Sequence, residues 1–231
     1  MVETETESAV RRARLVAALR SITPAMRSRL SELKAEGQQL RSRSDLIWHL
    51  MLGSFAAMGN SRGYAGLFGN KELVSSSLFD TVVSVPPSSR KPYLENILRR
   101  AKVRMASKKA EWLVANIVMI MAKGGLESVR QCALGLVGRE AKLKFMTSFR
   151  GFGDKYGRNV WMVQYDADFR DTIAVDERIK RVTEALGYSF RTYGEHEAFY
   201  CQIAAEVGLE AWEVDRLLYW FRDHFVSSIR V

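Results

Sequence analysis

The sequence predicts an all-α fold, and three observations support this prediction. Apolar residues recur mostly at helical spacing, and strand-like alternation is rare. Only four prolines are present in 231 residues, so long helical stretches go uninterrupted. Glycines such as Gly37 and the pair Gly124-Gly125 stand where periodic stretches stop. A chain of this length can bury a proper core, either in one domain or in two small lobes.

About ten helices are expected in order along the chain. Those in the N-terminal half span residues 9–22, 24–36, 46–58, 93–106 and 108–122. Thr23-Pro24 is typical of an N-cap followed by proline at the first helical position, and Gly37 is expected to end that helix. The third helix is apolar nearly all round, which predicts that it is buried. Residues 75–89 are rich in serine, proline and valine, which indicates a loop or a short irregular segment.

The C-terminal half continues the helical pattern. Its expected helices span residues 126–136, 140–148, 156–165, 177–186, 195–207 and 211–225. Asp176 stands where an N-cap would stand, directly ahead of Glu177. The last stretch, with its aromatic residues, is expected to form one helix to Phe225.

Charge and composition narrow the range of functions. The formal net charge is +9 and the isoelectric point is near 9.7, which favours a polyanionic partner over the alternative of a merely basic soluble protein. The two cysteines are far apart and the three histidines lack ligand spacing, so neither a disulfide framework, a metal site nor a cofactor is expected. The longest apolar run, residues 113–122, is too short to span a bilayer. The acidic N-terminus lacks a signal peptide, so a cytoplasmic location is expected.

The most informative stretch begins at Gly151-Phe152-Gly153. Two glycines one residue apart allow a tight turn and a close approach of the backbone to a partner. A turn that opens a helix presents backbone N–H groups and the positive end of the helix dipole, a combination that binds phosphate. Lys155 is expected in the first turn of that helix, where the dipole, and burial if present, would favour the uncharged, nucleophilic amine.

These residues resemble a motif of the helix-hairpin-helix DNA glycosylase superfamily, which contains endonuclease III and 8-oxoguanine DNA glycosylase. The family motif is a Gly-hydrophobic-Gly hairpin, one residue, a lysine and, about twenty residues later, a Val-Asp segment followed by a basic residue. The matching residues here are Gly151-Phe152-Gly153, Lys155, Ala174-Val175-Asp176, Arg178 and Arg181. The lysine-to-aspartate gap is slightly long, and Phe149-Arg150 replaces the usual Leu-Pro. The resemblance covers roughly residues 45–221.

The resemblance implies two helical lobes with a helix-hairpin-helix motif, about residues 143–165, at the cleft between them. Residues 1–44 and 183–231 would form a discontinuous helical lobe, and residues 45–182 a helical barrel lobe. Some family members carry a four-cysteine iron–sulfur cluster, which two cysteines cannot supply.

The implied activity is base-excision repair by a bifunctional DNA glycosylase and AP lyase. Lys155 would attack the sugar and form a Schiff base, and Asp176 would stabilise the positive charge that develops there. The residues implied in DNA binding are Arg150, Gly151, Gly153, Arg158, Asn60 and Arg62. Phe152, Asn159, Trp220 and Phe221 are candidates for the base pocket. The expected partner is damaged double-stranded DNA, with 8-oxoguanine favoured, and the protein is expected to be a monomer, nucleoid-associated if bacterial or archaeal.

Simpler interpretations remain open for each residue. A lysine at a helix start is usually a solvated charge, an aspartate before a helix is usually an N-cap, and Gly59-Asn60-Ser61 is equally typical of a helix end. A non-catalytic helix-hairpin-helix protein that binds duplex DNA is the alternative for the whole chain. An enzyme for oxidised pyrimidines is a further alternative, and RNA binding by the basic residues 93–109 is a weaker one.

Overall fold

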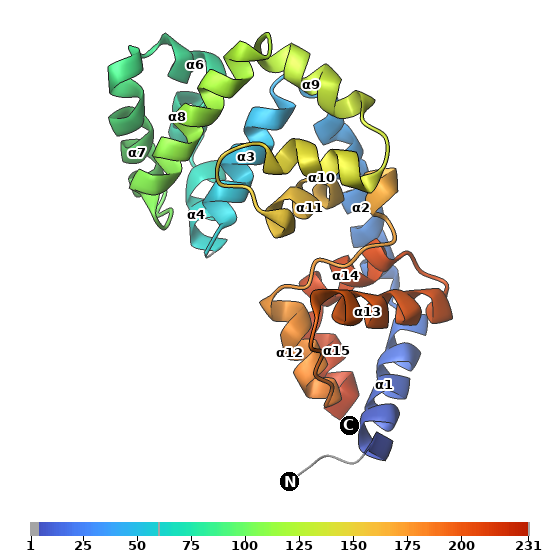
Figure 1. Cartoon of the computed structure of the whole chain (residues 1–231). Helices are drawn as coiled ribbons and strands as arrows, with labels where there is room; N and C mark the ends of the chain where they lie inside the picture. The colour runs from blue at the N-terminus through green and yellow to red at the C-terminus, as the bar shows by residue number, and fades with distance from the viewer. Residues whose placement is uncertain (1–4, 60, 231) are drawn as a thin grey trace. The chain divides into compact units, whose positions relative to one another are not determined.

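The computed structural model describes residues 5–59 and 61–230, so Asn60 lies outside the described residues. The described part of the chain is mostly helical and contains no strand (Figure 1). Fifteen α-helices and two short 3₁₀ helices follow one another in that part. The all-α prediction is therefore confirmed, with more and shorter helices than expected.

The chain divides into two compact units. Unit 1 comprises Met1–Gln39 and Trp161–Val231, and unit 2 comprises Leu40–Val160. The chain passes from unit 2 back to unit 1 after Val160, whereas the resemblance implied a lobe boundary after residue 182. Residues 161–182 belong with unit 1 because side chains of that unit bond to their backbone, as when Trp212 Nε1 donates to the carbonyl of Met162 at 2.7 Å.

Unit 2 is built around one buried helix, α3 (Leu46–Ala57), which begins where predicted and ends one residue earlier. The other helices of unit 2 are α4 (Ser61–Phe68), α5 (Lys71–Ser76), α6 (Phe79–Ser84), α7 (Arg90–Arg100), α8 (Ala106–Ala122), α9 (Gly125–Gly135), α10 (Arg139–Thr147) and most of α11 (Asp154–Val163). Helix α3 packs against α4 and α9, and α7 packs along α8 (Figure 1). Trp48 and Phe55 of α3 are both fully buried, as its apolar sequence requires.

The prediction of a loop or a short irregular segment at residues 75–89 is wrong. The region holds the end of α5, then α6 and the 3₁₀ helix η1 (Pro87–Ser89). The side chain of Asn70 caps α5 by accepting from the backbone N–H groups of Glu72 and Leu73. Trp48 then fixes the turn between α5 and α6, because its Nε1 donates to the carbonyl of Ser77 at 2.7 Å. These tertiary contacts outweigh the weak helix propensity of the serines and valines.

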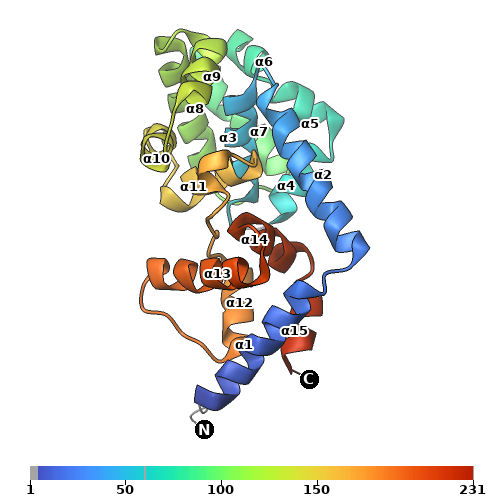
Figure 2. The same cartoon turned by 90° about the vertical axis from the view of Figure 1, so that its right-hand side faces the viewer.

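Unit 1 joins the two ends of the chain. Its helices are α1 (Glu5–Arg20), most of α2 (Pro24–Arg41), η2 (Ala167–Phe169), α12 (Glu177–Leu186), α13 (Tyr193–Val207), α14 (Ala211–Trp220) and α15 (Arg222–Arg230). Helix α1 packs against α15, α13 and α12 (Figure 2). The bounds of α12 are those predicted, since Asp176 caps it and Gly187 ends it at a φ of +79°.

Several helix ends differ from the prediction, by six residues for α7, which ends at Arg100 and not at residue 106, and two of the differences have a plain structural cause. Helix α2 does not stop at Gly37 but continues to Arg41. Gly37 is buried there, and a Cβ atom at this position would lie 2.8 Å from the carbonyl oxygen of Val163. The last predicted helix is divided at Phe221, where φ is −120° and ψ is 27°. The division lets α15 turn so that Phe225 and Ile229 become fully buried.

Within residues 5–59 and 61–230, no single helix is both long and apolar enough to cross a membrane. The bent pair α8 and α9, which meet at 84°, reaches that length and composition only together. The same residues contain no cluster of three or more His, Cys, Asp or Glu side chains that could hold a metal ion.

Candidate functional site

The hairpin predicted from the two glycines joins α10 to α11 in unit 2. Gly151 has a φ of +88°, which side-chain-bearing residues rarely adopt. A Cβ atom at Gly151 would lie 2.5 Å from Cε3 of Trp112 and 2.9 Å from Cζ of Phe55. Only glycine therefore fits this position, both in backbone conformation and in space.

A buried amide from another helix holds the residue before Gly151. Asn116 of α8 is fully buried, and its Nδ2 donates to the carbonyl of Arg150 at 3.0 Å. The backbone N–H of Arg150 donates back to Oδ1 of Asn116 at 2.8 Å. The two hydrogen bonds satisfy both backbone groups of Arg150 and fix the entry to the turn. Asn116 was missed as a site residue, although it is the one polar side chain that interrupts the apolar run 113–122.

The second glycine and the lysine lie on the open side of the turn. Gly153 has no atom within 4 Å of an added Cβ and is exposed. Lys155 is the second residue of α11 and is also exposed, with its Nζ 5.9 Å from the centre of the Tyr156 ring. The first N–H groups of a helix lack partners within the helix, so this end of α11 can donate to an anion. Burial of Lys155, one of the two effects considered from the sequence, does not occur in the structure.

The other predicted residues of unit 2 lie in different settings. Arg150 is exposed beside the turn, and Arg62 is exposed at the second position of α4. Arg158 and Asn159 are half-buried on α11. Phe152 is only 7% exposed, with its ring 5.2 Å from that of Phe55. Its side chain therefore belongs to the core that supports the hairpin.

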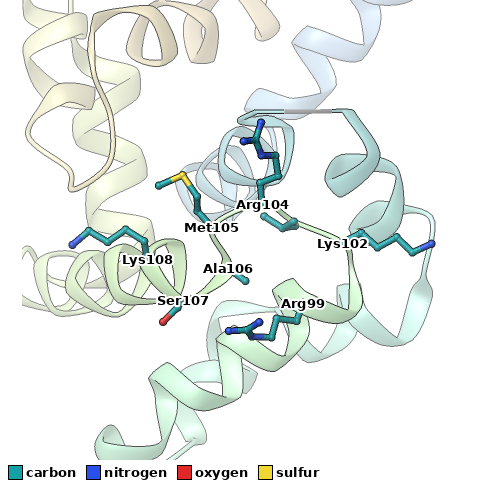
Figure 3. Close-up of a pocket in the computed structure, with 8 residues that line it drawn as sticks. Arg99, Lys102, Arg104, Met105, Ala106, Ser107 and Lys108 are labelled. Carbon is teal, nitrogen blue, oxygen red and sulfur yellow. The ribbon is translucent and has the colours of Figure 1, made fainter.

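Residues 58 and 59, which follow α3, are held by three elements of unit 2. Fully buried Lys109 of α8 donates from Nζ to the carbonyl of Met58 at 2.7 Å. Burial, with Arg104 nearby, lowers the pKa of Lys109 to about 8. Arg104 projects from the segment before α8 (Figure 3) and donates to the carbonyl of Gly59 at 3.4 Å. Tyr156, next to Lys155, hydrogen-bonds to the backbone of Gly59, and burial raises the pKa of this phenol.

In unit 1, Asp176 is the N-cap of α12. Its Oδ1 accepts from the backbone N–H of Arg178 at 2.8 Å and from that of Ile179 at 3.1 Å. Its Oδ2 lies 3.5 Å from the Arg178 guanidinium, which stacks 3.8 Å from the centre of the Tyr219 ring. The capping interpretation of Asp176 is correct. One carboxylate oxygen carries both capping bonds, and a quarter of the side chain, 26%, remains exposed.

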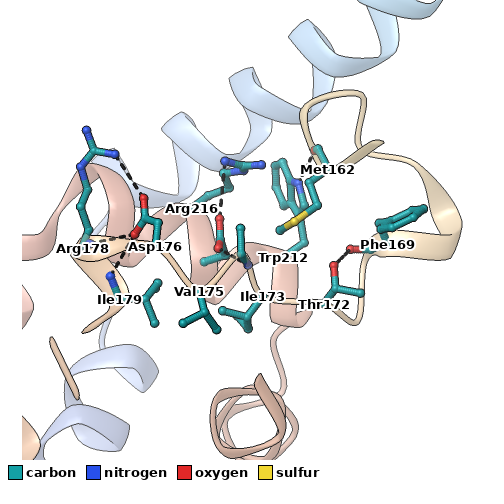
Figure 4. Close-up of polar contacts among 12 residues, drawn as sticks. Met162, Phe169, Thr172, Ile173, Val175, Asp176, Arg178, Ile179, Trp212 and Arg216 are labelled. Atoms are coloured by element: carbon teal, nitrogen blue, oxygen red, sulfur yellow. Dashed lines mark hydrogen bonds and ion pairs between the residues drawn. The ribbon is translucent and has the colours of Figure 1, made fainter. Parts of the chain in front are cut away.

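The three residues before Asp176 are held by side chains from α13 and α14, and Figure 4 shows the part of this network around Asp176 and α14. Ile173 N–H donates to Glu197 Oε1 at 3.2 Å, and Tyr193 Oη donates to the carbonyl of Ile173 at 2.8 Å. Ala174 N–H donates to Asp215 Oδ1 at 2.9 Å, and Val175 N–H donates to Tyr193 Oη at 3.3 Å. The backbone groups of this segment bond to side chains, as they would bond to a neighbouring strand in a sheet. These bonds fix the position of the segment that leads into Asp176.

The carboxyl group of Asp215 is buried and interacts electrostatically with Asp176. It is 4% exposed, and its Oδ2 lies 3.5 Å from the Arg216 guanidinium. Burial raises the pKa of Asp215 to about 6, while Arg216 and the bond from Ala174 oppose the shift and Asp176 adds to it. Sequence reasoning missed this residue, although its spacing from Ala211, Trp212 and Leu218 places it on the buried face of α14. No comparable signal marks Tyr193 or Glu197.

The predicted residues are shared between the units. Lys155, Arg150, Gly151, Gly153, Arg158, Arg62, Phe152 and Asn159 belong to unit 2, and Asp176, Trp220 and Phe221 belong to unit 1. Trp220 ends α14 half exposed, with the Arg29 guanidinium 4.6 Å from its ring centre, and Phe221 is half-buried. Within unit 2 the structure brings the hairpin, Asn116 and Lys155 together. Within unit 1 it gathers Asp176, Arg178 and Asp215.

Comparisons with known proteins identify the fold. No family model and no curated protein sequence matches this chain. Its structure is similar to that of Methanocaldococcus jannaschii 8-oxoguanine DNA glycosylase, with a TM-score of 0.68 at 18% identity over 91% of this chain and 94% of the other. The 8-oxoguanine DNA glycosylase of Thermotoga maritima gives a TM-score of 0.68 at 15% identity over 91% and 96%.

A third similar structure contains nucleic acid. It is the M. jannaschii 8-oxoguanine glycosylase/lyase in complex with a 15mer DNA containing 8-oxoguanine, with a TM-score of 0.64 at 15% identity over 86% of this chain and 91% of the other. The chain therefore has the fold of these glycosylases along nearly its whole length, as the hairpin motif predicted.

Proposed function

We propose that this protein is a base-excision-repair DNA glycosylase with AP lyase activity, and that it excises an oxidised base, 8-oxoguanine, from duplex DNA. One observation carries the proposal: an obligatory Gly151 hairpin opens α11 and presents exposed Lys155 at the start of that helix. This hairpin is part of a fold shared with 8-oxoguanine DNA glycosylases.

The hairpin is suited to holding a DNA phosphate. The open side of Gly153 lets the backbone approach an anion closely, and the N–H groups at the start of α11 would donate to it. Arg150 and Arg158 would add positive charge beside the phosphate, and Arg62 at the start of α4 would contact the backbone elsewhere. Asn60 is our candidate for the residue that enters the duplex.

Base removal requires that the damaged nucleotide leave the stack. Uncharged Lys155 Nζ would attack C1′, and the base would depart with the electron pair of the glycosidic bond and take up a proton. Asp176 would stabilise the positive charge on the sugar during this step. The sugar ring would then open to give a Schiff base with Lys155. Loss of a 2′ proton would expel the 3′ phosphate and cut the strand.

The residues that contact the flipped base are proposed from their positions. Asn159 on α11, with Trp220 and Phe221 at the end of α14, would offer hydrogen-bonding and stacking surfaces. Phe152 would support the hairpin from below, since its ring is buried against Phe55.

A second candidate function is binding of duplex DNA without chemistry. The hairpin and the basic residues would serve such a protein equally well, but it would have no use for Lys155 as a nucleophile. A glycosylase for oxidised pyrimidines is a further candidate, which the same fold and the same lysine would serve.

Borohydride trapping tests the proposal. Wild type, Lys155→Gln and the control Lys123→Gln, which alters an exposed lysine at the end of α8, are each incubated with a duplex carrying one 8-oxoguanine. We expect a covalent adduct and strand cleavage with wild type and Lys123→Gln, and neither with Lys155→Gln. No adduct on 8-oxoguanine, oxidised pyrimidine or abasic duplexes would exclude the lyase mechanism. An adduct on the oxidised-pyrimidine duplex alone would mean that the substrate is an oxidised pyrimidine and not 8-oxoguanine.

A further inference from the structure

An open basic depression lies at the turn between α7 and α8 in unit 2, in a part of the chain that the hairpin does not include. It has a volume of about 670 Å³ and is lined by residues 99 and 102–108. Four of these eight residues are cationic and none is acidic: Arg99, Lys102, Arg104 and Lys108. This density of positive charge is well above that of the chain as a whole, in which 35 of 231 residues are Lys or Arg.

Carboxylates offset only part of this charge. Arg99 pairs with Glu95 on its own helix, and Lys108 pairs with Glu111 at 2.8 Å. Arg104 bonds to a backbone carbonyl, that of Gly59, which leaves its charge uncompensated. The side chain of Lys102 makes no hydrogen bond or ion pair with any residue in the described part of the chain, and it is exposed. Two of the four cations are therefore available to an anion without breaking an ion pair.

The directions of the side chains indicate the kind of anion. Lys102, Arg104 and Lys108 spread outward from the turn in different directions (Figure 3). Cations that point in different directions cannot all contact one compact phosphate, whereas duplex DNA offers phosphates at regular intervals along its backbone. The amides at the start of α8 add to the positive field, because its N-cap residue Met105 supplies no side-chain hydrogen bond.

We propose that this turn is a second phosphate-binding surface, which contacts the backbone of duplex DNA at a place other than the hairpin. The proposal rests on the proposed function for the choice of duplex DNA. The contact is independent of base sequence, because Lys and Arg that bind phosphates read no base edges. Its role is to orient the duplex on unit 2 while the hairpin holds the strand to be cut.

The test is the salt dependence of binding to an undamaged duplex, measured by fluorescence anisotropy from 50 to 300 mM NaCl. The variant Lys102→Ala/Lys108→Ala removes two exposed charges of the turn. The control Lys71→Ala/Lys123→Ala removes two exposed lysines that do not line the depression. Each phosphate contact contributes about 0.9 to the slope of log K against log salt concentration. We expect the slope to fall by about 1 to 2 in the test variant, because Lys102 is unpaired whereas Lys108 must first leave Glu111, and to stay at the wild-type value in the control.

Further arms separate the outcomes. Lys102→Arg/Lys108→Arg retains the charges and should restore the wild-type slope. Equal slopes for wild type and the alanine variant would overturn the second surface. The proposed function would remain intact if, in the borohydride trapping, wild type forms the adduct and Lys155→Gln does not. If Lys102→Ala/Lys108→Ala loses binding to duplex RNA but not to duplex DNA, the choice of DNA is overturned. If wild type binds no duplex at all, both proposals fail together.

Discussion

The side chain of Asn116 and the backbone of Arg150 form a closed pair of hydrogen bonds, at 3.0 and 2.8 Å, although they are 34 residues apart. The side-chain amide donates to the carbonyl and accepts from the N–H of the same residue, as a neighbouring strand does in a sheet. It connects α8 to the hairpin that carries Lys155.

Asn116→Ala should destabilise the protein by about 1–3 kcal/mol, because the N–H and the carbonyl of Arg150 would both lose a part-buried hydrogen bond. Urea unfolding followed by circular dichroism measures this difference. Asn96→Ala on the exposed face of α7 is the control and should change the free energy of unfolding by less than about 0.5 kcal/mol. Equal effects at the two asparagines would show that Asn116 is only one more polar residue of a helix.

The two glycines of the hairpin should respond differently to alanine. Gly151→Ala places a methyl group 2.5 Å from the Trp112 ring at a φ of +88°, so we expect a loss of about 2 kcal/mol or more. Gly153→Ala meets no atom within 4 Å, and its stability should stay within about 0.5 kcal/mol of wild type.

The same pair separates folding from binding. If the open side of Gly153 faces a phosphate, Gly153→Ala should weaken duplex binding while the protein remains fully folded. Unchanged affinity, measured by anisotropy on the folded variant, would place the phosphate elsewhere.

Substitutions at Asp176 can separate its capping role from its proposed chemical role. Asparagine caps helices as well as aspartate does, so Asp176→Asn should keep the stability of wild type. It removes the negative charge, however, and should lower single-turnover base excision by at least tenfold. Asp176→Ala should lose the activity and also about 1 kcal/mol of stability.

The control for capping is Thr192→Ala, which removes the side-chain cap of α13 in the same unit. It should lower stability to a similar extent without affecting excision by the folded protein. Full activity in Asp176→Asn would reduce Asp176 to a helix cap.

The buried carboxyl of Asp215 predicts a pH dependence of stability. Its folded pKa of about 6 lies above the value of about 4 expected in the unfolded chain. Between these values the folded state binds more protons, so the contribution of this group to stability is greatest below pH 4 and is lost as the pH rises through 6. Asp215→Asn does not ionise, and its Oδ1 can still accept from Ala174.

The free energy of unfolding of Asp215→Asn relative to wild type should therefore rise between pH 4.5 and 7.5. Its steepest slope would be at most about 1.4 kcal/mol per pH unit for one proton. Urea titrations at four pH values measure the trend. Asp223→Asn, at an exposed aspartate of α15, should show no comparable trend. A flat difference for Asp215→Asn would mean that Arg216 keeps the carboxylate charged throughout.

Local signals in the sequence predicted the parts of the structure that depend on local chemistry. The N-cap Asp176 and the terminating Gly187 fix both ends of α12, and the buried character of α3 follows from its composition. The hairpin was also visible, because a positive φ next to a helix start leaves glycine as its signature.

Residues whose role depends on distant partners could not be recognised in this way. Nothing near Tyr193 indicates that its hydroxyl will fasten Ile173 and Val175, twenty and eighteen residues away. The helices at residues 75–89 depend on the cap from Asn70 and on Trp48, which a propensity argument does not weigh. Phe152 was taken for a pocket residue because the motif gives its position along the chain but not the side that its ring faces.

Gly37 has a consequence for the sequences that this fold tolerates. The carbonyl oxygen of Val163 approaches α2 so closely that a single methyl group would lie 2.8 Å from it. In a saturation mutational scan, position 37 should reject alanine and serine as firmly as tryptophan, a pattern that no helix-propensity scale produces. A glycine that looks like a helix terminator would in this way be recognised from variant frequencies alone as a point where two backbones touch.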